Sequence, residues 1–406
     1  MRIIYVTARL PHGANEAFIV PEIRQIVRAG HDVLVVPRSP RGAILHGTEL
    51  LRRSFREGVF SPGVLKTALN TVLVAPGQTA EAIRLLAGSR SLTVNLKNVA
   101  VVPKALWLAE TAVRWKADHI HCHWSGTTAT AAMLASARSG VPWSLTAHRW
   151  DIVENNLLAA KVRSASFVRF ISQDGLRMAR SIGIGPAENA RVLHMGAAIP
   201  ETPGRRPGTG RVVLCPARLV EVKGHRYLLE AWRILQGRGL GSELWLAGSG
   251  ELRPELEALC ARLGLGGSVR FLGAFRHSVL LKMYEEGAVA AVVLASLDLG
   301  DGHHEGIPVS LIEAMSYGIP VVATDAGGTP ELVTPRTGLL VPPADAEALA
   351  DAIETVLSDR VYSERLGLAG RERVRVDFNI VRVASTLVSE FEAAAKGRAL
   401  AQASNY

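Results

Sequence analysis

The chain has 406 residues, of which 48% are hydrophobic and 20% are charged. This length exceeds one ordinary hydrophobic core and suits two domains, and the composition is that of a globular enzyme rather than a disordered chain. The net charge of +9 is unevenly placed, because residues 1–200 carry net +12 and residues 201–406 carry net −3. A basic first half favours phosphate-rich partners such as nucleic acid, anionic lipid or a phosphorylated substrate, with general solubility as the alternative.

Cysteine usage and hydropathy indicate where the protein works. Cys122, Cys215 and Cys260 lie far apart and are odd in number, without metal-ligand spacing or a disulfide framework, so we expect a reducing compartment. The first residues, MRIIYVTARL, are typical of a first strand rather than a secretory signal, and the apolar run at 288–297 is too short to span a bilayer. We expect a cytoplasmic protein, or one peripheral on the inner membrane.

Short apolar strands alternate with amphipathic helices in the first half. The predicted strands are RIIYVTA, DVLVVP, HIHCHW, WSLTAH, SFVRFIS and ARVLHM. The predicted helices between them are EAFIVPEIRQIVRAG, which stops at Gly30, TTATAAMLASARSG and DGLRMARSI. This alternation is typical of a parallel sheet with helices on both faces.

Residues 40–115 interrupt the alternation. The stretch 38–56 holds five arginines against Glu49 alone, and apolar helical segments such as KALWLAETAVRWKA follow it. One interpretation is an inserted helical pair that packs on the domain. The other is a basic, apolar surface for a membrane or an amphipathic acceptor.

Around 196–210 a Gly- and Pro-rich stretch predicts a linker, after which the alternation restarts and ends in helices at 345–358, 361–375 and 380–397. We therefore predict an α/β chain of two doubly wound, Rossmann-like domains that face a central cleft. Residues 1–198 form the first domain, on which a helix at about 380–400 packs back. Residues 199–379 form the second domain.

The stretch EGIPVSLIEAM places Glu305 before a helix start and Glu313 about two turns along it. A helix N-terminus offers free N–H groups to a phosphate, and a carboxylate accepts hydrogen bonds from a diol. The two acids could therefore bracket a pyrophosphate, one at the sugar and one at the ribose, although a solvated loop Glu and a helix-surface Glu are equally compatible. Arg218 and Lys223 follow a strand, where they could neutralise a diphosphate or be ordinary surface cations.

These motifs together resemble the retaining GT-B glycosyltransferases of family four, also called group one. The resemblance rests on PARLVEVKG, LAGSGELRPELEALCARLGL, VRFLG, EGIPVSLIEAMSYGIPVVATDAGG and PELV…TGLLVPPAD, in family order over residues 211–345. The first half resembles the branch that builds exopolysaccharides such as colanic acid, through NEAFIVPEIRQIVRAGHDV and HIHCHWSGTTATAAMLASARSGVPWSLTAH.

The resemblance implies that residues 1–198 form an acceptor-binding domain and residues 199–379 a nucleotide-sugar-binding domain. It also implies a nucleotide-diphosphate sugar donor with Arg218 and Lys223 on its phosphates, Glu305 on the sugar and Glu313 on the ribose. His148, in TAHRWD, matches a family histidine near the transferred sugar, and Ala274 lies in the loop that would line the base. The catalytic candidates are Glu305, His148, Arg218 and Lys223. The donor-binding candidates are Arg218, Lys223, Gly248, Ala274, Glu305, Gly306, Ile307, Pro308, Leu311, Glu313 and Gly13.

The chain departs from the family after its first strand, where Gly13 stands without a neighbouring glycine and residues 15–18 read NEAF instead of SETF. His119, His121 and His123 alternate on one strand and so share a face that could bind zinc. No carboxylate-rich partner motif accompanies them, and the family generally needs no metal, so we expect no metal and no cofactor beyond the donor substrate.

The expected function is transfer of a sugar from a nucleotide-diphosphate sugar to a carbohydrate or lipid-linked acceptor in cell-surface polysaccharide synthesis. The basic first half would contact an anionic membrane, and we expect no nucleic-acid partner because no aromatic-rich basic motif is present. The alternatives are a GT-B nucleotide-sugar epimerase or hydrolase, and a non-catalytic nucleotide-sugar-binding subunit.

Overall fold

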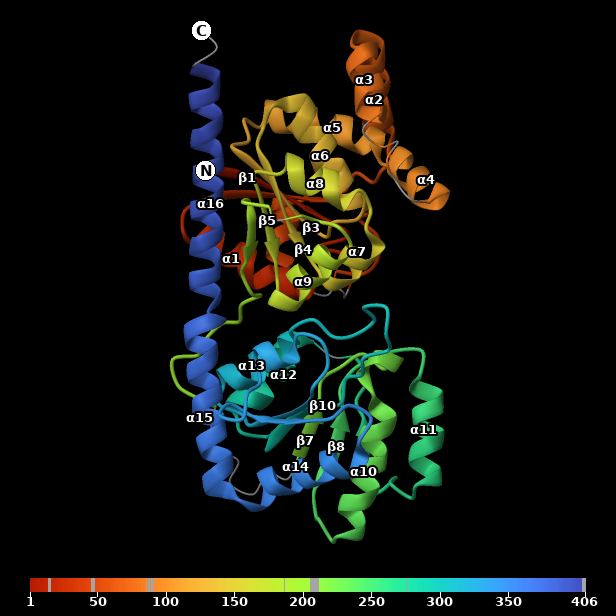
Figure 1. Cartoon of the computed structure of the whole chain (residues 1–406), viewed down its shortest axis with the longest axis vertical. Helices are drawn as coiled ribbons and strands as arrows, with labels where there is room; N and C mark the ends of the chain where they lie inside the picture. The colour runs from red at the N-terminus through yellow and green to blue at the C-terminus, as the bar shows by residue number, and fades with distance from the viewer. Residues whose placement is uncertain are drawn as a thin grey trace. The chain divides into compact units, whose positions relative to one another are not determined.

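The computed structural model describes residues 1–403 apart from 14–15, 45–47, 85, 87, 89–90, 186, 205–211 and 275. The chain divides into two compact units (Figure 1). Unit 1 comprises residues 1–193 and 381–406, and unit 2 comprises residues 194–380. The chain thus leaves unit 1 after Leu193, where the sequence predicted a boundary at 198, and returns to it at Val381. Residues 205–210 of the predicted linker lie outside the described residues.

Unit 1 is built on a six-stranded sheet in the order β2-β1-β3-β4-β5-β6, in which every neighbouring pair is parallel. The strands are β1 (Arg2–Thr7), β2 (Asp32–Pro37), β3 (His119–His123), β4 (Trp143–Ala147), β5 (Phe167–Phe170) and β6 (Ala190–Val192). The sequence predicted all six of these strands, because each is a short apolar or β-branched run between helical segments.

Helices cover both faces of this sheet (Figure 1). They are η1 (Ala17–Ile19), α1 (Val20–Arg28), η2 (Thr48–Arg53), α2 (Pro62–Val74), α3 (Pro76–Arg84), α4 (Leu92–Ala100), α5 (Val102–Arg114), α6 (Thr127–Ser139), α7 (Arg149–Glu154), α8 (Leu158–Ser164), α9 (Gln173–Ser181) and α16 (Ile380–Ala403). The segment between β2 and β3 therefore forms four α-helices, α2 to α5, where one interpretation of the sequence expected a helical pair.

The two faces of the unit 1 sheet differ in polarity because successive side chains of a strand alternate. Ile4 and Val6 of β1, with Ile120 and Cys122 of β3, join an apolar core that includes the inner faces of α5 and α6. The opposite face carries a polar layer of buried side chains. These are Tyr5, His119, His121, His123, Ser144, Thr146 and Arg169.

Unit 2 has a second parallel six-stranded sheet, in the order β12-β11-β10-β7-β8-β9. Its strands are β7 (Val212–Cys215), β8 (Glu243–Leu246), β9 (Val269–Phe271), β10 (Ala291–Leu294), β11 (Val321–Thr324) and β12 (Leu339–Val341). Its helices are η3 (Glu221–Lys223), α10 (His225–Gly237), α11 (Arg253–Arg262), α12 (His277–Glu285), α13 (Val309–Ser316), η4 (Thr329–Glu331), α14 (Ala346–Ser358) and α15 (Arg360–Asp377). The expected fold class, α/β with two doubly wound Rossmann-like domains, is confirmed.

Each sheet has a point at which the strand order reverses. In unit 1 it lies between β1 and β3, and in unit 2 between β7 and β10. Connections on the two sides of such a point cross to opposite faces of the sheet, which opens a crevice at the carboxyl ends of the two strands. These two points are where functional side chains are to be sought.

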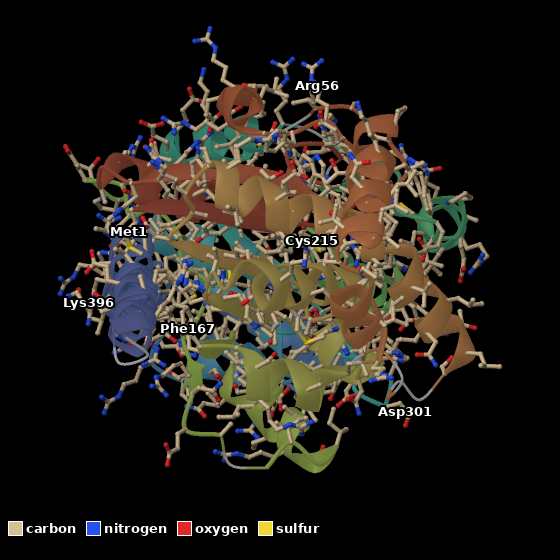
Figure 2. All side chains as sticks on the ribbon, turned by 90° about the horizontal axis from the view of Figure 1, so that it is seen from above. Met1, Arg56, Phe167, Cys215, Asp301 and Lys396 are labelled. Atoms are coloured by element: carbon tan, nitrogen blue, oxygen red, sulfur yellow. The ribbon has the colours of Figure 1, made fainter. Side chains whose placement is uncertain are left out.

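The three cysteines lie inside the protein. Cys122, Cys215 and Cys260 are all free and buried. Arg56 is exposed and lies at the edge of the view in Figure 2. Over the part of the chain that is described, no helix combines the length and the hydropathy needed to cross a bilayer.

Candidate functional site

The reversal point of the unit 2 sheet brings together two predicted residues that are far apart in sequence. Lys223 ends η3 in the connection after β7, and Glu305 lies in the loop after β10. Their side chains form an ion pair between Lys223 Nζ and Glu305 Oε2, and Ser296 Oγ donates to the same oxygen over 3.3 Å. Both side chains are mostly buried, with 14% and 18% exposed. The crevice thus holds one cation and one carboxylate in direct contact.

Close backbone contacts hold these loops in place. Gly224 adopts φ +58°, and a Cβ there would lie 1.9 Å from the carbonyl oxygen of Ala295. Gly327 likewise adopts φ +58°, and a Cβ there would lie 1.9 Å from the carbonyl oxygen of Glu305. Only glycine satisfies both the conformation and the space. The glycines therefore allow the connections after β7, β10 and β11 to meet at the crevice.

Helix α13 begins beside Glu305. Its N-cap is Pro308, whose side chain makes no capping hydrogen bond to the first turn. Ile307, Pro308 and Leu311 are buried around this helix start, while Glu305 and Gly306 are partly exposed. An uncapped helix start presents N–H donors and a positive dipole end, which suits a phosphate.

Glu313 lies within α13 and has a partner that the sequence did not suggest. Its Oε1 lies 2.7 Å from His277 Nε2 at the start of α12, and 13% of the Glu313 side chain is exposed against 35% for His277. The two acids predicted to bind the sugar and the ribose are thus each paired, Glu305 with Lys223 and Glu313 with His277. This second pair has no local signal in the sequence, because His277 lies on α12, where no helix was predicted.

The remaining predicted residues of unit 2 lie on loops at the carboxyl ends of the strands. Arg218 is exposed after β7, and Ala274 is exposed after β9. A Cβ on Gly248, which follows β8, would lie 2.0 Å from the carbonyl oxygen of Ala217. Gly248 therefore allows its loop to pack against the loop that carries Arg218.

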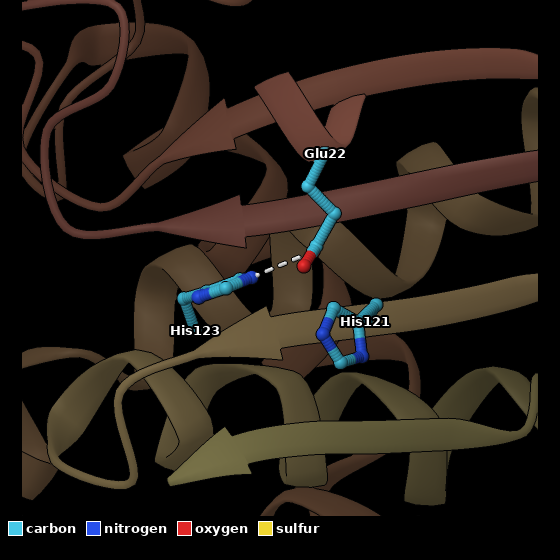
Figure 3. A group of neighbouring side chains, drawn as sticks. All are labelled: Glu22, His121 and His123. Carbon is cyan, nitrogen blue, oxygen red and sulfur yellow. Dashed lines mark hydrogen bonds and ion pairs between the residues drawn. The ribbon is translucent and has the colours of Figure 1, made fainter. Parts of the chain in front are cut away.

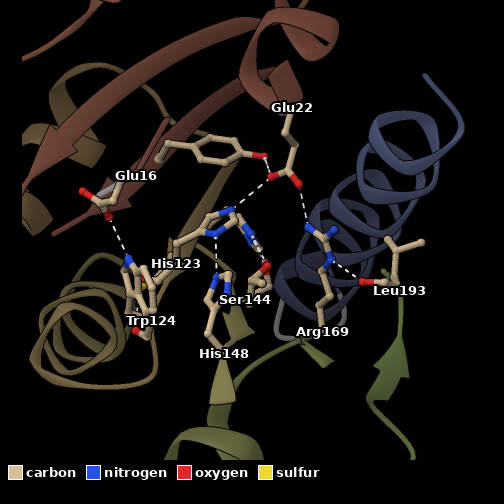
Figure 4. Close-up of polar contacts among 12 residues, drawn as sticks. Glu16, Glu22, His123, Trp124, Ser144, His148, Arg169 and Leu193 are labelled. Atoms are coloured by element: carbon tan, nitrogen blue, oxygen red, sulfur yellow. Dashed lines mark hydrogen bonds and ion pairs between the residues drawn. The ribbon is translucent and has the colours of Figure 1, made fainter. Parts of the chain in front are cut away.

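In unit 1 the polar layer forms a connected set of hydrogen bonds beneath α1 (Figure 4). The Ser144 hydroxyl lies 2.7 Å from His119 Nε2 and 2.8 Å from His121 Nδ1, and Thr146 Oγ1 lies 3.0 Å from His121 Nε2. Burial lowers the pKa of His119 to about 3 and places that of His121 well below its usual value. These two histidines are neutral hydrogen-bonding groups in a buried layer.

Glu22 of α1 is the charged centre of this layer. Its Oε1 accepts from Tyr5 Oη at 3.0 Å and lies 3.1 Å from His123 Nε2, while its Oε2 accepts from Arg169 Nη1 at 2.6 Å. Glu22, His123 and Arg169 have no exposed side-chain surface. Burial alone would raise the pKa of Glu22, but the Arg169 charge and the His123 hydrogen bond outweigh it and hold the pKa well below its usual range.

His148, a predicted catalytic residue, sits at the end of a chain that starts at Glu22. His123 Nδ1 lies 3.1 Å from His148 Nε2. If neutral His123 donates from Nε2 to Glu22, its Nδ1 accepts from His148 Nε2–H, and His148 then presents Nδ1 as an acceptor. Phe18 and Trp124 pack on the ring, with centroids at 5.4 Å and 4.3 Å. Burial lowers the pKa of His148 well below its usual value, so the ring is neutral.

Asp151 and Lys161 are two further buried ionisable side chains of unit 1. His148 is the N-cap of α7, and its backbone N–H donates to Asp151 Oδ1 at 2.8 Å. Burial raises the pKa of Asp151 to about 7, against the lowering effect of backbone donors that include Ser125. Burial also lowers the pKa of Lys161 to about 7, and its Nζ donates to the carbonyls of Ser125, Gly126 and Asn156.

Glu22, His121 and His123 are close enough to raise the question of a metal, since one ligand atom of each lies within 4.8 Å of the others (Figure 3). A cation there would stand beside the Arg169 guanidinium, and Glu22 already accepts three donors. The arrangement fits a hydrogen-bonded network better than a divalent site. It also explains why three histidines alternate on β3, since His119, His121 and His123 all face the polar layer.

The loop after β1 is organised by Glu16 rather than by a pair of glycines. Its carboxylate accepts from the backbone N–H groups of Ala8, Arg9 and Leu10 at 2.6–2.9 Å and from Trp124 Nε1 at 2.7 Å. Gly13 lies in the same loop with φ +74°, and its N–H donates to the carbonyl of Ala43. Asn15, from the departure noted in the sequence, lies outside the described residues.

Two doubly wound parallel sheets, each with polar side chains at or beside its reversal point, define a chain of GT-B fold. Solved structures of this fold superpose on nearly the whole chain. Anabaena HepE in complex with UDP and glucose matches with a TM-score of 0.70 at 21% identity, covering 97% of this chain and 99% of that one. Sucrose-phosphate synthase from Thermosynechococcus elongatus matches with a TM-score of 0.73 at 20% identity, covering 97% and 99%.

Sequence comparison identifies the family. Residues 202–373 match the glycosyl transferases group 1, and residues 21–201 match the glycosyl transferase 4-like domain. The chain thus carries a glycosyl transferase 4-like domain followed by a glycosyl transferases group 1 domain.

Curated relatives extend this result. The amylovoran biosynthesis glycosyltransferase AmsK of Erwinia amylovora is 37% identical over 168 residues, 41% of each chain. The putative colanic acid biosynthesis glycosyltransferase WcaL of Escherichia coli is 34% identical over 201 residues, 48% of each chain. A GDP-mannose-dependent phosphatidylinositol monomannoside mannosyltransferase of Mycobacterium tuberculosis is 29% identical over 293 residues, 67% of this chain and 76% of that one. The matched stretches thus span less than half of AmsK and WcaL.

Proposed function

We propose that the protein is a retaining glycosyltransferase that moves a sugar from a nucleotide-diphosphate sugar to a carbohydrate or lipid-linked acceptor in cell-surface polysaccharide synthesis. The observation that carries this proposal is the Lys223–Glu305 pair in the unit 2 crevice, beside the uncapped start of α13. A cation and a helix start suit a diphosphate, and a carboxylate suits sugar hydroxyls. The names of AmsK and WcaL support polysaccharide synthesis, and the UDP and glucose bound to HepE support the donor class.

Donor binding would replace the Lys223–Glu305 ion pair by two contacts with the donor. Without donor, Lys223 and Glu305 compensate each other's charge in a mostly buried position. A bound donor would give Lys223 a phosphate oxygen as its partner and give Glu305 the hydroxyls of the sugar. Arg218, exposed in the same connection after β7, would reach the same diphosphate. Separating Lys223 from Glu305 costs free energy. Only a ligand that carries both an anionic group and hydroxyl groups offsets this cost, so a bare phosphate should bind less well.

The chemical step would retain the configuration of the sugar. The bond between the anomeric carbon and the diphosphate oxygen breaks, and its electron pair leaves with the nucleoside diphosphate. The acceptor hydroxyl bonds to the anomeric carbon on the same face, and its proton passes to a leaving phosphate oxygen. Lys223, Arg218 and the α13 N–H groups would stabilise the growing charge on the diphosphate, so no metal is needed. Neutral His148 would orient a sugar hydroxyl.

The decisive experiment incubates the protein with a panel of nucleotide sugars and measures binding, donor consumption and transfer to added acceptors. Transfer with retained anomeric configuration is the expected result. Donor consumption that needs no acceptor would instead support a GT-B epimerase or hydrolase. Binding without any turnover would support a non-catalytic nucleotide-sugar-binding subunit, and failure to bind any nucleotide sugar would contradict all three.

We also propose that the protein works in the cytoplasm at the inner membrane, to which its basic first half is attracted. Arg52 and Arg56 are exposed, and Arg53 is 3.6 Å from Asp32 in a half-exposed pair. Each basic residue near an anionic surface contributes up to about 1 kcal/mol. Replacing Arg52, Arg53 and Arg56 with Glu should weaken the salt-sensitive part of binding to anionic vesicles, and unchanged binding would contradict this role.

A further inference from the structure

The helices between β2 and β3 expose an unusual share of the large apolar side chains. Among the described residues, ten of the nineteen exposed large hydrophobic side chains fall between Phe60 and Val99. Helix α5 is not their source, since its inner residues, such as Leu106 and Leu108, are buried against the core of unit 1. Helices α2, α3 and α4 project from this unit in Figure 1 and carry nine of these ten side chains, and Phe60 lies just before α2.

Helix α2 is apolar on both sides. Val64 and Ala68 are buried, and the helix packs through them toward α5. Four further apolar residues are exposed at positions i, i+4, i+7 and i+8, namely Leu65, Leu69, Val72 and Leu73. This spacing places them on one helix face. A helix with a second apolar face lacks the polar outer side that water normally requires.

Helix α4 has the opposite polarity to an ordinary surface helix. Its fully buried residue is Asn98, whose Nδ2 donates to Asn156 Oδ1 at 2.8 Å and whose Oδ1 accepts from Thr130 Oγ1 at 2.9 Å. Three apolar residues at positions i, i+4 and i+7 face outward instead, namely Leu92, Leu96 and Val99, and the first two are 83% and 71% exposed. The polar contacts fix the helix so that its leucines point away from the core.

The charges around these faces are of one sign. Between residues 58 and 109 the sequence has a single acid, Glu81, against five basic residues. Lys66, Arg84 and Lys97 are exposed, and two of them adjoin the exposed leucines Leu65 and Leu96 in sequence. Long basic side chains beside an apolar face can lay their methylene groups on it and reach an anionic headgroup with the charge.

We propose that the α2–α4 apolar surface, formed by Leu65, Leu69, Val72, Leu73, Leu92, Leu96 and Val99, enters the interfacial layer of an anionic bilayer. Helix α2 has 13 residues and is about 20 Å long, shorter than the roughly 30 Å hydrocarbon core, so it lies in the interface and does not cross it. A second copy of the chain is a poorer occupant. A two-fold contact would set the basic rims of the two surfaces against each other.

This inference rests on the proposed membrane location and adds a second mode of attachment to it. The arginines of the first half attract the bilayer from solution, and salt screens that attraction. The leucines hold the protein by burial of apolar surface, which salt does not screen. Binding to anionic vesicles should therefore have a salt-sensitive part that depends on Arg52, Arg53 and Arg56, and a salt-resistant part that depends on the α2–α4 apolar surface.

Co-sedimentation with vesicles of equal phosphatidylcholine and phosphatidylglycerol tests this, at low salt and at about 1 M salt, where the Debye length is about 3 Å. The variant L65S/L69S/L73S should bind at least about 10-fold more weakly at high salt, since covering even one leucine shifts an equilibrium by about that factor. The control V361S/L368S replaces two exposed apolar residues of α15 in unit 2 and should bind as the unchanged protein does. A second variant, L92S/L96S, tests α4 alone.

Several outcomes would overturn the proposal. These are equal high-salt binding by L65S/L69S/L73S and the unchanged protein, an equal loss in the V361S/L368S control, and a lipid-free dimer that the serine substitutions dissociate. Binding of a nucleotide sugar is measured on the same proteins, because the exposed leucines lie outside the donor crevice. If no protein binds a nucleotide sugar, the proposed transferase function fails while the vesicle result still stands.

Discussion

Replacing Glu22 by Gln should destabilise unit 1 strongly, because this carboxylate serves three buried donors. Tyr5 and His123 contact Oε1 and Arg169 contacts Oε2. A Gln side chain has one acceptor oxygen and one NH2 group. Whichever way the amide is turned, its NH2 group, which is a donor, lies against one of the buried donors that contact Glu22. Breaking one side of a buried ion pair costs about 3–5 kcal/mol, because the other charge stays buried without its partner. We expect Glu22→Gln to lower the free energy of unfolding of unit 1 by that amount.

Tryptophan fluorescence in urea can follow this unit selectively. Five of the seven tryptophans lie in unit 1, and Trp232 and Trp245 of unit 2 can be replaced by Phe in the background protein. A loss of about 3–5 kcal/mol corresponds to a decrease of roughly 6–20 °C in the Tm of a unit of this size. The control is Arg24→Met, which breaks the exposed pair with Glu49 in unit 1 and should cost less than about 1 kcal/mol.

The pH dependence of the stability that Glu22 contributes has a defined sign. The pKa of Glu22 is lower in the folded than in the unfolded chain, so its stabilising effect is complete above the unfolded value of about 4.3 and is lost as the pH falls below it. The stability difference between the unchanged protein and Glu22→Gln should therefore shrink below about pH 4. The double variant Glu22→Gln/Arg169→Met should recover much of the loss, because no buried charge remains.

A loss below about 1 kcal/mol for Glu22→Gln would refute the reasoning, because that is the value of an exposed pair. So would a double variant whose loss equals the sum of the two single losses, since the pair would then contribute no coupling.

Three further predictions concern the donor crevice. In folded protein, Lys223→Ala or Arg218→Ala should lower kcat by roughly 100-fold or more, as for other groups that stabilise transition-state charge. An unchanged kcat in both variants would show that neither residue takes part in the mechanism. Calorimetry should show that Glu313→Ala weakens the affinity for the nucleoside diphosphate and for the full donor alike. Glu305→Ala should leave the affinity for the nucleoside diphosphate intact and impair transfer. Equal losses of affinity for both ligands in both variants would contradict the hypothesis that the two acids bracket the pyrophosphate. His277→Ala should change nucleoside diphosphate affinity by less than about fivefold, because its pair with Glu313 is partly exposed, and a larger loss would place His277 itself on the ligand.

Much of the fold follows from patterns that are local in sequence. Strand and helix order can be predicted because apolar runs and amphipathic periods need only neighbouring residues, and Gly30 and Gly318 both adopt the positive φ expected at helix ends. The side chains of β3 alternate as predicted. Pairings between distant residues cannot be obtained this way. Lys223 and Glu305 are separated by 82 positions, and only the strand order of the sheet brings their loops together.

Some buried partners did leave a local signal. Glu22 occupies the apolar face of α1 beside Ile23 and Ile26, and Arg169 interrupts the apolar strand FVRF. A single charge inside an apolar stripe requires a partner of opposite sign, so two such positions in one domain predict each other. Helix α4 left no such signal, because its sequence does not reveal that the side with Asn98 faces the core.

The discontinuous composition of unit 1 sets an order of events during synthesis. Phe391 of α16 stacks on His119 at 4.7 Å and packs beside Phe167 at 5.8 Å, and its side chain is fully buried. Residues 381–403 leave the ribosome only after all of unit 2. The first unit to be translated is thus the last to be completed, and until then its polar layer stays open to water on the side that α16 will cover. We therefore expect unit 2 to be able to fold during synthesis before unit 1 is complete.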